Sequence, residues 1–367
     1  MNPQALRRYS RHLLIPEVGL RGQERLAAAR VLIVGAGGLG SPALQYLGAA
    51  GVGTIGIVDD DVVDETNLQR QTIFSTRDVG LRKAVVAAAR VQALNPLVDV
   101  QALPVRFEPS NARVLVRAYD LVLDCTDRFA TRYCINDACH FERKLDVYGS
   151  IFRFDGQVSV LCADGGPCYR CLYPEAPPPE LTPTCAEGGV LGAIAGIVGT
   201  WQANEALKII LQIGKPLVGR LMLVDCLEAR SREVSFARDP LCRLCGEQPQ
   251  IVEIEEIAYE PAHEDGVVEI DAEELDEALH DATLLDVREP HEAVLGSIDG
   301  ACSIPASQLE ARMSELDSAR RYIVACRVGV KSRWALRRLH EAGFERLAHL
   351  RGGLLAYAAR HEQFEFF

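Results

Sequence analysis

Residues 31–42, VLIVGAGGLGSP, decide the fold of the first half of the chain. The first four residues have the pattern of a short buried strand, and Gly35, Gly37 and Gly40 follow at the spacing G-x-G-x-x-G. A strand that turns into a helix in this way presents backbone N–H groups and the positive end of the helix to a phosphate. The stretch therefore predicts a nucleotide site, without identifying the nucleotide or the reaction.

Strand-like and helical stretches alternate between residue 29 and about residue 150. Apolar runs such as TIGIVD and DLVLDC predict strands, and stretches such as SPALQYLGAAG and LRKAVVAAARVQAL predict the helices between them. This order predicts an α/β fold with a doubly wound, Rossmann-like and mostly parallel sheet. Beyond residue 151, the alternating sequence FRFDGQVSVLC predicts an antiparallel extension, and the apolar stretch 191–212 predicts a long helix.

A second, smaller α/β domain is predicted beyond an acidic segment. Residues 248–263 combine acidic side chains with prolines, as linkers often do. The strand candidates VVEI, TLLDV, YIVAC and RLAHL follow, separated by helical stretches. We therefore predict a first domain at 1–247, a linker at 248–263 and a small α/β domain at 264–367.

The composition limits the class of partner. A hydrophobic content of 48% is ordinary for a globular protein, and a formal net charge of −12 argues against nucleic acid or an anionic membrane as the main partner. We find neither an apolar run of the roughly 18 residues that a membrane span needs nor a signal peptide, so we expect a cytoplasmic protein. Twelve cysteines in a reducing compartment favour metal ligands and reactive thiols over disulfides.

Charged side chains near the glycine turn bear on which nucleotide binds. Asp59 stands at the distance expected of the acidic residue in a NAD-binding unit, so an NAD-dependent oxidoreductase is one interpretation. Arg70 and Lys83 add more positive charge than one pyrophosphate requires, which favours a triphosphate. Asp124 and Asp127 follow another strand, where a carboxylate can hold Mg²⁺. The alternative is that these cations are surface charges and Asp127 is a helix cap.

Four cysteines occur in two C-x-x-C pairs. Cys168 and Cys171 form the first pair, and Cys242 and Cys245 form the second. In a cytosolic chain this pattern predicts a tetrahedral Cys₄ zinc site, which is structural because no ligand position is left for water or substrate. A redox dithiol at either pair is the alternative.

Two further cysteines are candidate reactive thiols. Cys185 lies in LTPTCAEGG, whose glycines and prolines favour an exposed loop over a place in the core. Cys326 opens CRVGVKS, and we expect a loop running through Gly329 to Lys331 before a helix at WALRRLHEAG. Backbone N–H groups of that loop, together with Arg327 and Lys331, would stabilise a thiolate that accepts a sulfane sulfur as a persulfide. An inert cysteine after a buried strand is the alternative.

Ordered motifs give the chain a resemblance to a known family over nearly its whole length. The motifs are RYSRHLLIPEVGLRGQERL, GAGGLGSP, DVVDETNLQRQ, DCTDRFATR, GSIFRFDGQVSV, PCYRCLYPE and TCAEGGVLG. They resemble the MoeB/ThiF family of ubiquitin-activating-like adenylyltransferases. The later stretches TLLDVREPHEAVLGSIDGACSIP and HLRGGLLAY resemble a rhodanese, so the order of domains is that of MoeZ-type adenylyltransferase/sulfurtransferases.

The resemblance implies roles for the charged residues around the glycine turn. In that reading Gly38 and Asp59 contact ATP, with Asp59 on the ribose, and Asp127 binds Mg²⁺. The phosphates are held by Asn67, Arg70 and Lys83. Arg128 stands in the ATP site where the family often has asparagine. Arg11 matches an arginine that reaches into the ATP site of a partner subunit, which implies a homodimer.

The resemblance also implies the reaction and its partners. The family adenylates the C-terminal glycine of a small ubiquitin-fold sulfur-carrier protein that ends in Gly-Gly, for which the small subunit of molybdopterin synthase is our best candidate. A Cys326 persulfide, charged by thiosulfate or a cysteine desulfurase, then supplies sulfur for a thiocarboxylate. Cys185 matches a second nucleophile, the zinc site is structural, and Asp286 and Arg288 order the rhodanese loop. The competing hypotheses are an NAD-dependent oxidoreductase and a non-catalytic scaffold for carrier and sulfur donor.

Overall fold

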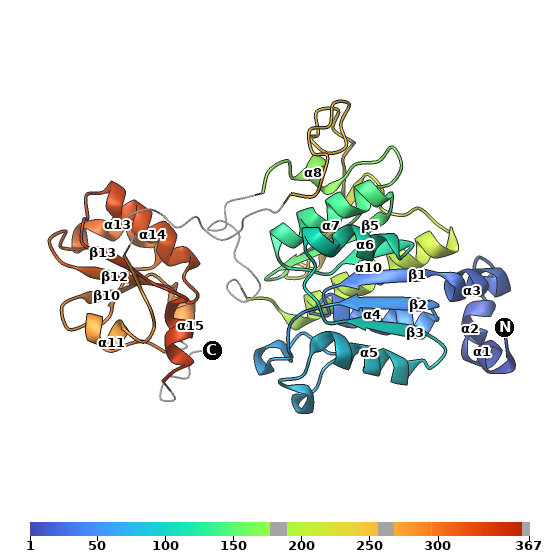
Figure 1. Cartoon of the computed structure of the whole chain (residues 1–367), viewed down its shortest axis with the longest axis horizontal. Coiled ribbons are helices and arrows are strands. Elements are labelled where there is room, and N and C mark those ends of the chain that lie inside the picture. Colours follow the sequence, from blue (N-terminus) through green and yellow to red (C-terminus); the bar gives the residue numbers. More distant parts are fainter. Residues whose placement is uncertain (177–188, 256–267, 295, 362–367) are drawn as a thin grey trace. The chain divides into compact units, whose positions relative to one another are not determined.

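The computed structural model describes residues 1–176, 189–255, 268–294 and 296–361 of the chain. These residues form two compact units, one before and one after the gap at 256–267 (Figure 1). Cys185 lies outside the described residues. Each unit contains its own sheet, in agreement with the predicted α/β fold with a second, smaller domain.

The first unit contains a sheet of eight strands in the order β3-β2-β1-β4-β5-β6-β7-β8. The first five strands of that order run parallel, and the last three are antiparallel to their neighbours. The predicted doubly wound sheet with an antiparallel extension is thus confirmed. The strands are β1 (Arg30–Val34), β2 (Thr54–Val58), β3 (Asp99–Leu103), β4 (Leu121–Asp124), β5 (Leu145–Phe152), β6 (Asp155–Leu161), β7 (Arg220–Asp225) and β8 (Arg230–Ser235).

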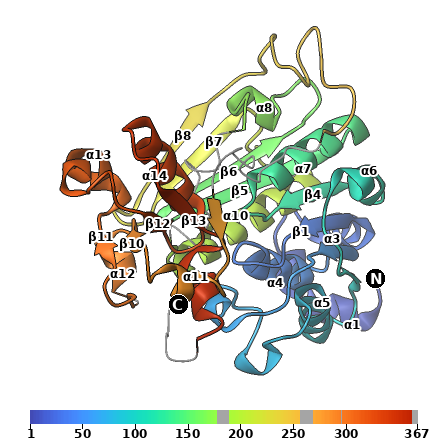
Figure 2. The ribbon, with the colours of Figure 1, turned by 60° about the vertical axis from the view of Figure 1, so that its left-hand side comes forward.

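Helices cover both faces of this sheet (Figure 2). Because side chains alternate along a strand, Ile33 of β1 packs on one face with Leu47 and Val198, whereas Val34 packs on the other with Ile135. No helix in the described part of the chain is long and apolar enough to cross a bilayer. The helices are α1 (Pro3–Arg8), α2 (Ser10–Leu13), α3 (Gly19–Ala28), α4 (Gly40–Ala50), α5 (Lys83–Leu94), α6 (Pro109–Arg117), α7 (Phe129–Glu142), α8 (Tyr169–Leu172) and α10 (Gly192–Leu211).

The register of the central strands brings their carboxyl ends together. Val34 of β1 lies opposite Val58 of β2 on one side and Asp124 of β4 on the other. Residues that follow these three strands are therefore neighbours in space although they are far apart in sequence. In a doubly wound sheet this edge is where ligands bind.

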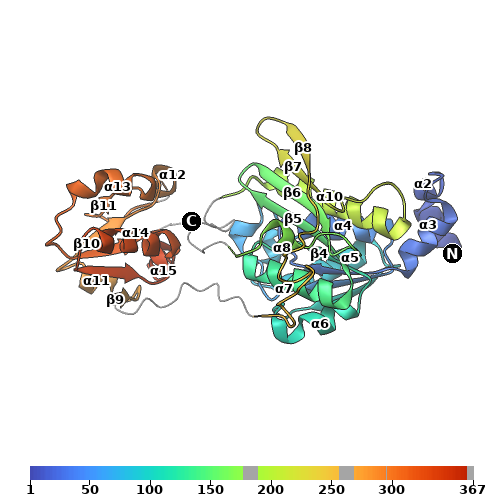
Figure 3. The same cartoon turned by 90° about the horizontal axis from the view of Figure 1, so that it is seen from above.

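The antiparallel part of the sheet ends in β8, an edge strand (Figure 3). All six residues of β8 are exposed.

The packing of the first unit continues past residue 247, since Ile251 is 2% exposed and lies in an apolar cluster with Cys168 and Cys242.

The second unit contains a parallel sheet in the order β11-β10-β12-β13-β9. Leu284 packs with Leu275 and Leu354 on one face of it, and Leu285 packs with Leu336 on the other. The strands are β9 (Val268–Ile270), β10 (Thr283–Asp286), β11 (Cys302–Ser303), β12 (Tyr322–Ala325) and β13 (Leu347–Leu350). The helices are α11 (Leu275–Ala278), α12 (Pro290–Ala293), α13 (Leu309–Arg312), α14 (Val330–Glu341) and α15 (Gly353–Ala358).

The loop after β12 is shorter than we predicted. Helix α14 begins at Val330, so Lys331 lies in the first turn of the helix and not in the loop. Gly329 adopts a φ of +97°, a left-handed conformation that glycine tolerates and most residues do not. This conformation at the N-cap turns the chain directly into the helix.

Candidate active sites

A pocket of about 430 Å³ opens at the carboxyl ends of β1, β2 and β4. Nine residues singled out in the sequence line it: Gly35, Gly37, Gly38, Asp59, Asn67, Arg70, Lys83, Asp127 and Arg128. They come from four separate stretches of the chain, and the sheet order places them around one space. The pocket therefore combines a glycine turn, carboxylates and several cations.

The glycine turn depends on the absence of side chains at two positions. A Cβ atom on Gly35, whose φ is +94°, would lie 2.8 Å from the carbonyl oxygen of Cys125. A Cβ atom on Gly40 would lie 2.1 Å from the carbonyl oxygen of Gly35. Only glycine lets the start of α4 pack this closely on the end of β1, which leaves the first turn of the helix facing the pocket.

Asp59 connects the end of β2 to the glycine turn. Its carboxylate accepts hydrogen bonds from the backbone N–H groups of Ala36 at 2.7 Å and Asp61 at 2.9 Å. Burial raises the pKa of the Asp59 carboxyl, and the hydrogen bond from Ala36 offsets part of this increase. The carboxylate is thereby held beside the turn, where an acidic residue binds a ribose hydroxyl in nucleotide-binding folds.

Two cationic side chains face the same pocket. Lys83, the first residue of α5, is 5% exposed, and its Nζ lies 3.1 Å from Oδ2 of Asp61. Arg70 donates from Nη1 to the carbonyl oxygen of Thr66 at 3.0 Å. Desolvated cations in a pocket attract polyphosphate more strongly than solvated surface charges do. The interpretation of both residues as solvated surface charges does not fit the burial of Lys83.

The two aspartates of DCTDRF have different environments. Asp127 is exposed and lines the pocket. Asp124 is 1% exposed, accepts hydrogen bonds from the backbone and hydroxyl of Thr126, and does not line the pocket. Burial raises the pKa of Asp124. The structure therefore leaves Asp127 as the metal candidate and gives Asp124 a structural place at the end of β4.

Two arginines that the sequence analysis did not single out also line the pocket. They are Arg106 and Arg132. Arg132 is 5% exposed and donates from Nη2 to the carbonyl oxygen of Thr126 at 3.0 Å. Arg132 lies in the first turn of α7, four residues after the N-cap residue Arg128, and this spacing is a signal that would have found it.

Arg11 does not line the pocket of its own chain. It lies on α2 with an exposed side chain.

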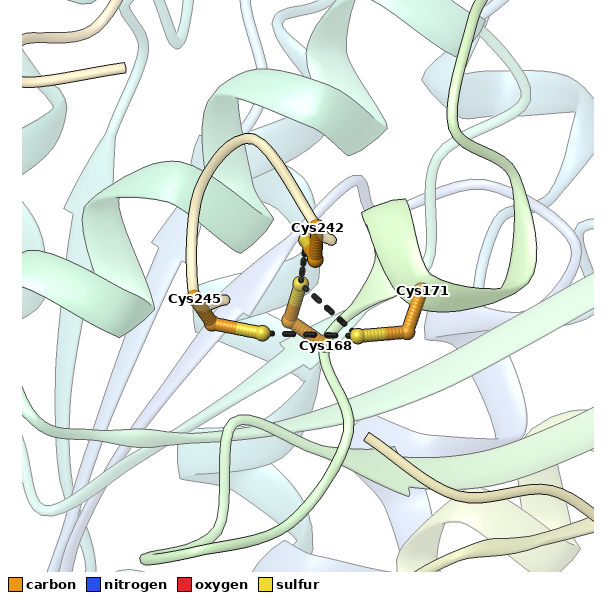
Figure 4. A group of neighbouring side chains, drawn as sticks. All are labelled: Cys168, Cys171, Cys242 and Cys245. Carbon is orange, nitrogen blue, oxygen red and sulfur yellow. Dashed lines mark hydrogen bonds between the residues drawn. The ribbon is translucent and has the colours of Figure 1, made fainter. Parts of the chain in front are cut away.

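The four cysteines of the two C-x-x-C pairs meet at one point (Figure 4). The Sγ atoms lie 3.8 Å apart between Cys168 and Cys171, 3.6 Å between Cys168 and Cys242, and 3.3 Å between Cys171 and Cys245. Four sulfurs around Zn²⁺ at about 2.3 Å are about 3.8 Å apart. The backbone N–H of Asp239 also donates to Cys171 Sγ at 3.4 Å. The cluster is compatible with a tetrahedral metal site that joins two distant segments.

In the second unit, hydrogen-bond donors surround Cys326 at the start of α14. The residue is 2% exposed, and its Sγ accepts hydrogen bonds from the backbone N–H of Gly329 at 3.2 Å and from the Ser332 hydroxyl at 3.4 Å. Donors of this kind, at the N-terminus of a helix, stabilise a thiolate.

The residues around the Cys326 loop are ordered by other pairs. We expected Lys331 to stabilise the thiolate of Cys326. Its Nζ donates to Glu292 at 2.7 Å, so the carboxylate offsets part of the positive charge that Lys331 offers the sulfur. Asp286 and Arg288 form a buried pair at 2.7 Å, which agrees with an ordering role. At the start of α15, the N–H group of Leu354 donates to the carbonyl oxygen of Cys326 at 2.9 Å.

Comparisons with known proteins agree with these two units. The ThiF family model matches residues 9–244, and the rhodanese-like domain model matches residues 271–360. The chain is 46% identical over 378 residues to the probable adenylyltransferase/sulfurtransferase MoeZ of Mycobacterium tuberculosis, covering 98% of this chain and 94% of that protein. It is 53% identical over 251 residues to the sulfur carrier protein adenylyltransferase of Thermus thermophilus, covering 67% of this chain and 93% of that protein.

A mammalian relative and a solved structure complete the comparison. The chain is 42% identical over 339 residues to the mouse adenylyltransferase and sulfurtransferase MOCS3, covering 88% of this chain and 73% of that protein. The crystal structure of Escherichia coli MccB with MccA-N7isoASN matches with a TM-score of 0.59 at 21% identity, covering 65% and 74% of the two chains, which supports the fold alone. The chain belongs to the ThiF family of MoeB/ThiF adenylyltransferases, with a rhodanese-like domain after the ThiF domain.

Proposed function

We propose that the chain adenylates the C-terminal glycine of a ubiquitin-fold sulfur-carrier protein and then transfers sulfur to it from a persulfide on Cys326. The observation that carries the first step is the single pocket that combines the glycine turn with Asp59, Arg70 and Lys83. The relatives named as both adenylyltransferase and sulfurtransferase support the pairing of the two activities.

The pocket supplies what a nucleotidyl transfer needs. The carrier carboxylate attacks the α-phosphorus of ATP, the bond to the β-phosphate bridging oxygen breaks, and pyrophosphate leaves an acyl-adenylate behind. Arg70 and Lys83 would stabilise the charge that builds up on the departing pyrophosphate, and Asp59 would hold the ribose. Asp127 would bind a Mg²⁺ ion, which would neutralise phosphate charge.

Sulfur transfer requires a nucleophile that carries an extra sulfur. The Cys326 thiolate takes the sulfane sulfur of its donor and becomes a persulfide; with thiosulfate as donor, sulfite leaves. The outer sulfur then attacks the acyl carbon of the adenylate, AMP leaves, and an acyl disulfide joins the carrier to Cys326. A second thiol attacks Cys326 Sγ and releases the carrier as a thiocarboxylate, and an external dithiol reduces the resulting disulfide.

Cys185 is our candidate for that second thiol. It lies outside the described residues, and its assignment rests on the TCAEGG motif.

For the sulfur donor, thiosulfate and a cysteine desulfurase are the two possibilities. Because Glu292 binds Lys331, less positive charge is left to attract a thiosulfate dianion, which favours the desulfurase. The small subunit of molybdopterin synthase is the carrier that we favour.

We propose that the cysteine cluster holds a structural Zn²⁺ ion. Replacing Cys242 and Cys245 with serine should remove one zinc per chain and lower the melting temperature of the first unit by more than about 10 °C, because the metal joins two distant segments. Metal content by mass spectrometry and calorimetry would measure both effects. Cys226→Ser is a matched control, since Cys226 is half-buried and outside the cluster. A double variant that retains its zinc would disprove the assignment.

We propose a homodimer in which Arg11 completes the pocket of the partner subunit. Its exposed position outside the pocket of its own chain supports this arrangement. The Arg11→Ala and Lys83→Met variants should each be inactive alone, and an equal mixture should regain about a quarter of the activity, because each mixed dimer has one complete site. Activity after exchange of subunits would be measured. If the mixture stays inactive although mixed dimers form, Arg11 acts within its own chain.

The adenylation half of the proposal is tested by exchange of labelled pyrophosphate into ATP. Exchange is expected only when a carrier ending in Gly-Gly is present, and a carrier without its last glycine should support none. Absence of exchange with every Gly-Gly carrier, together with tight binding of NAD, would favour an oxidoreductase instead. Binding of carrier and donor without any exchange would favour a scaffold.

A further inference from the structure

A buried histidine lies behind the Cys326 loop. His349 is 1% exposed and sits on β13, next to β12, whose last residue precedes Cys326. Its Nε2 lies 3.0 Å from the Ser332 hydroxyl and 2.9 Å from the carbonyl oxygen of Gly329. Ser332 in turn lies 3.4 Å from Cys326 Sγ. A continuous hydrogen-bonded chain thus runs from the imidazole to the sulfur.

The carbonyl oxygen of Gly329 determines which tautomer the imidazole adopts. A carbonyl only accepts hydrogen bonds, so His349 Nε2 must carry the proton when it lies 2.9 Å from Gly329. The same N–H then also points at the oxygen of Ser332. The Ser332 hydroxyl proton has two acceptors within reach, the carbonyl oxygen of Gly329 at 3.0 Å and Cys326 Sγ at 3.4 Å. Because His349 N–H also donates to that carbonyl oxygen, it competes with Ser332 there and favours donation of the hydroxyl proton to the sulfur.

The other side of the imidazole faces a carboxylate. Nδ1 of His349 lies 3.7 Å from Oε1 of Glu269, and among the described residues it has no hydrogen-bond partner. Arg333 and Arg351 both bind Glu269, which compensates for the charge of the carboxylate. Burial lowers the pKa of His349, so the neutral Nε2–H form is favoured at neutral pH.

We propose that His349 is a positioning residue for sulfur transfer, which acts through Ser332 to direct a hydroxyl proton at Cys326 Sγ. The inference rests on the proposed function, in which Cys326 accepts the sulfur. A second donor on the sulfur stabilises the thiolate, and the thiolate is the form that attacks a sulfane sulfur. Neither the C-R-V-G-V-K-S loop nor its helix contains His349, which strand pairing brings to the loop.

Three cationic side chains near the loop, those of Lys331, Arg333 and Arg351, are engaged in ion pairs. Lys331 binds Glu292 from α12. Arg333, from α14, and Arg351, after β13, bind Glu269 of β9. Arg327, which follows Cys326, is half-buried. Two neutral donors, Gly329 N–H and the Ser332 hydroxyl, make direct hydrogen bonds to the sulfur.

The test measures how fast iodoacetamide alkylates Cys326 in the full chain as a function of pH, by mass spectrometry of the Cys326 peptide. His349→Leu and Ser332→Ala should each slow alkylation about tenfold at neutral pH, and the rates should converge with wild type at alkaline pH. His349→Gln should keep most of the wild-type profile, because its amide N–H can occupy the place of Nε2–H. Alkylation of Cys302 in the same samples should not change, which controls for loss of folding.

The double variant tests whether His349 acts through Ser332. We expect Ser332→Ala/His349→Leu to be no slower than Ser332→Ala alone. An unchanged pH profile in His349→Leu, or additive effects in the double variant, would overturn the inference. Failure of the proposed function gives a different result: a Cys326→Ala chain would still produce thiocarboxylate, whatever the alkylation profiles are.

Discussion

Replacing Lys83 by methionine is expected to slow carrier-dependent pyrophosphate exchange by about a hundred- to a thousandfold. The Lys83 side chain is almost fully buried at the start of α5 and the residue lines the pocket, so water cannot easily replace it in stabilising phosphate charge. The lost interaction is strongest when pyrophosphate leaves, so kcat should fall far more than ATP binding weakens. Steady-state exchange rates at several ATP concentrations measure both quantities.

The Lys83 variant should fold normally, which makes the loss interpretable. Methionine preserves the apolar stem, and the Asp61 partner is half exposed, so water solvates its carboxylate after the change. Lys215→Met is a matched control because Lys215 is exposed and outside the pocket. If Lys83→Met exchanged pyrophosphate as fast as Lys215→Met, the assignment of this pocket to ATP would be wrong.

Replacing Cys326 by serine is expected to lower thiocarboxylate formation by more than about a thousandfold, while pyrophosphate exchange stays at the wild-type rate. A serine hydroxyl cannot hold a sulfane sulfur, and its oxygen fits where Sγ accepts hydrogen bonds from Gly329 and Ser332. The two assays together separate the activities of the two units. Thiocarboxylate would be quantified on the intact carrier, and exchange would be measured with the same protein sample.

Cys302→Ser provides the comparison for Cys326→Ser. Cys302 lies in the same unit, on β11, and is half-buried. It should retain both activities. Normal thiocarboxylate formation by Cys326→Ser would show that another thiol carries the sulfur, and a parallel loss of exchange would show that the second unit contributes to adenylation.

Much of the architecture was predictable because local patterns and turn chemistry agree. The strand VLIV, the glycine turn and the apolar helix form one continuous signal, and the observed β1 and α4 follow it closely. Strand β8 has no such signal. Its sequence RSREVS is polar on both faces, and all six residues are exposed, so only its pairing with β7 makes it a strand.

The residues of the candidate sites also differ in whether the sequence alone identifies them. Residues within the glycine turn, the C-x-x-C pairs and the Cys326 loop are identifiable because the chemistry needs those residue types at short spacing. Asp124 and Asp127 lie in one motif, and only the burial of Asp124 distinguishes them. His349 reaches the sulfur loop through the pairing of β12 with β13, and no sequence spacing encodes that neighbourhood.

The central claim is that ATP consumption at the first unit and sulfur transfer at the second act on the same carrier molecule. The most direct measurement is the intact mass of a Gly-Gly carrier after incubation with the full chain, Mg²⁺-ATP and a sulfur donor. We predict that one oxygen of its terminal carboxylate is replaced by sulfur, and that this requires both ATP and Cys326. A thiocarboxylate that forms equally fast without ATP would contradict the account.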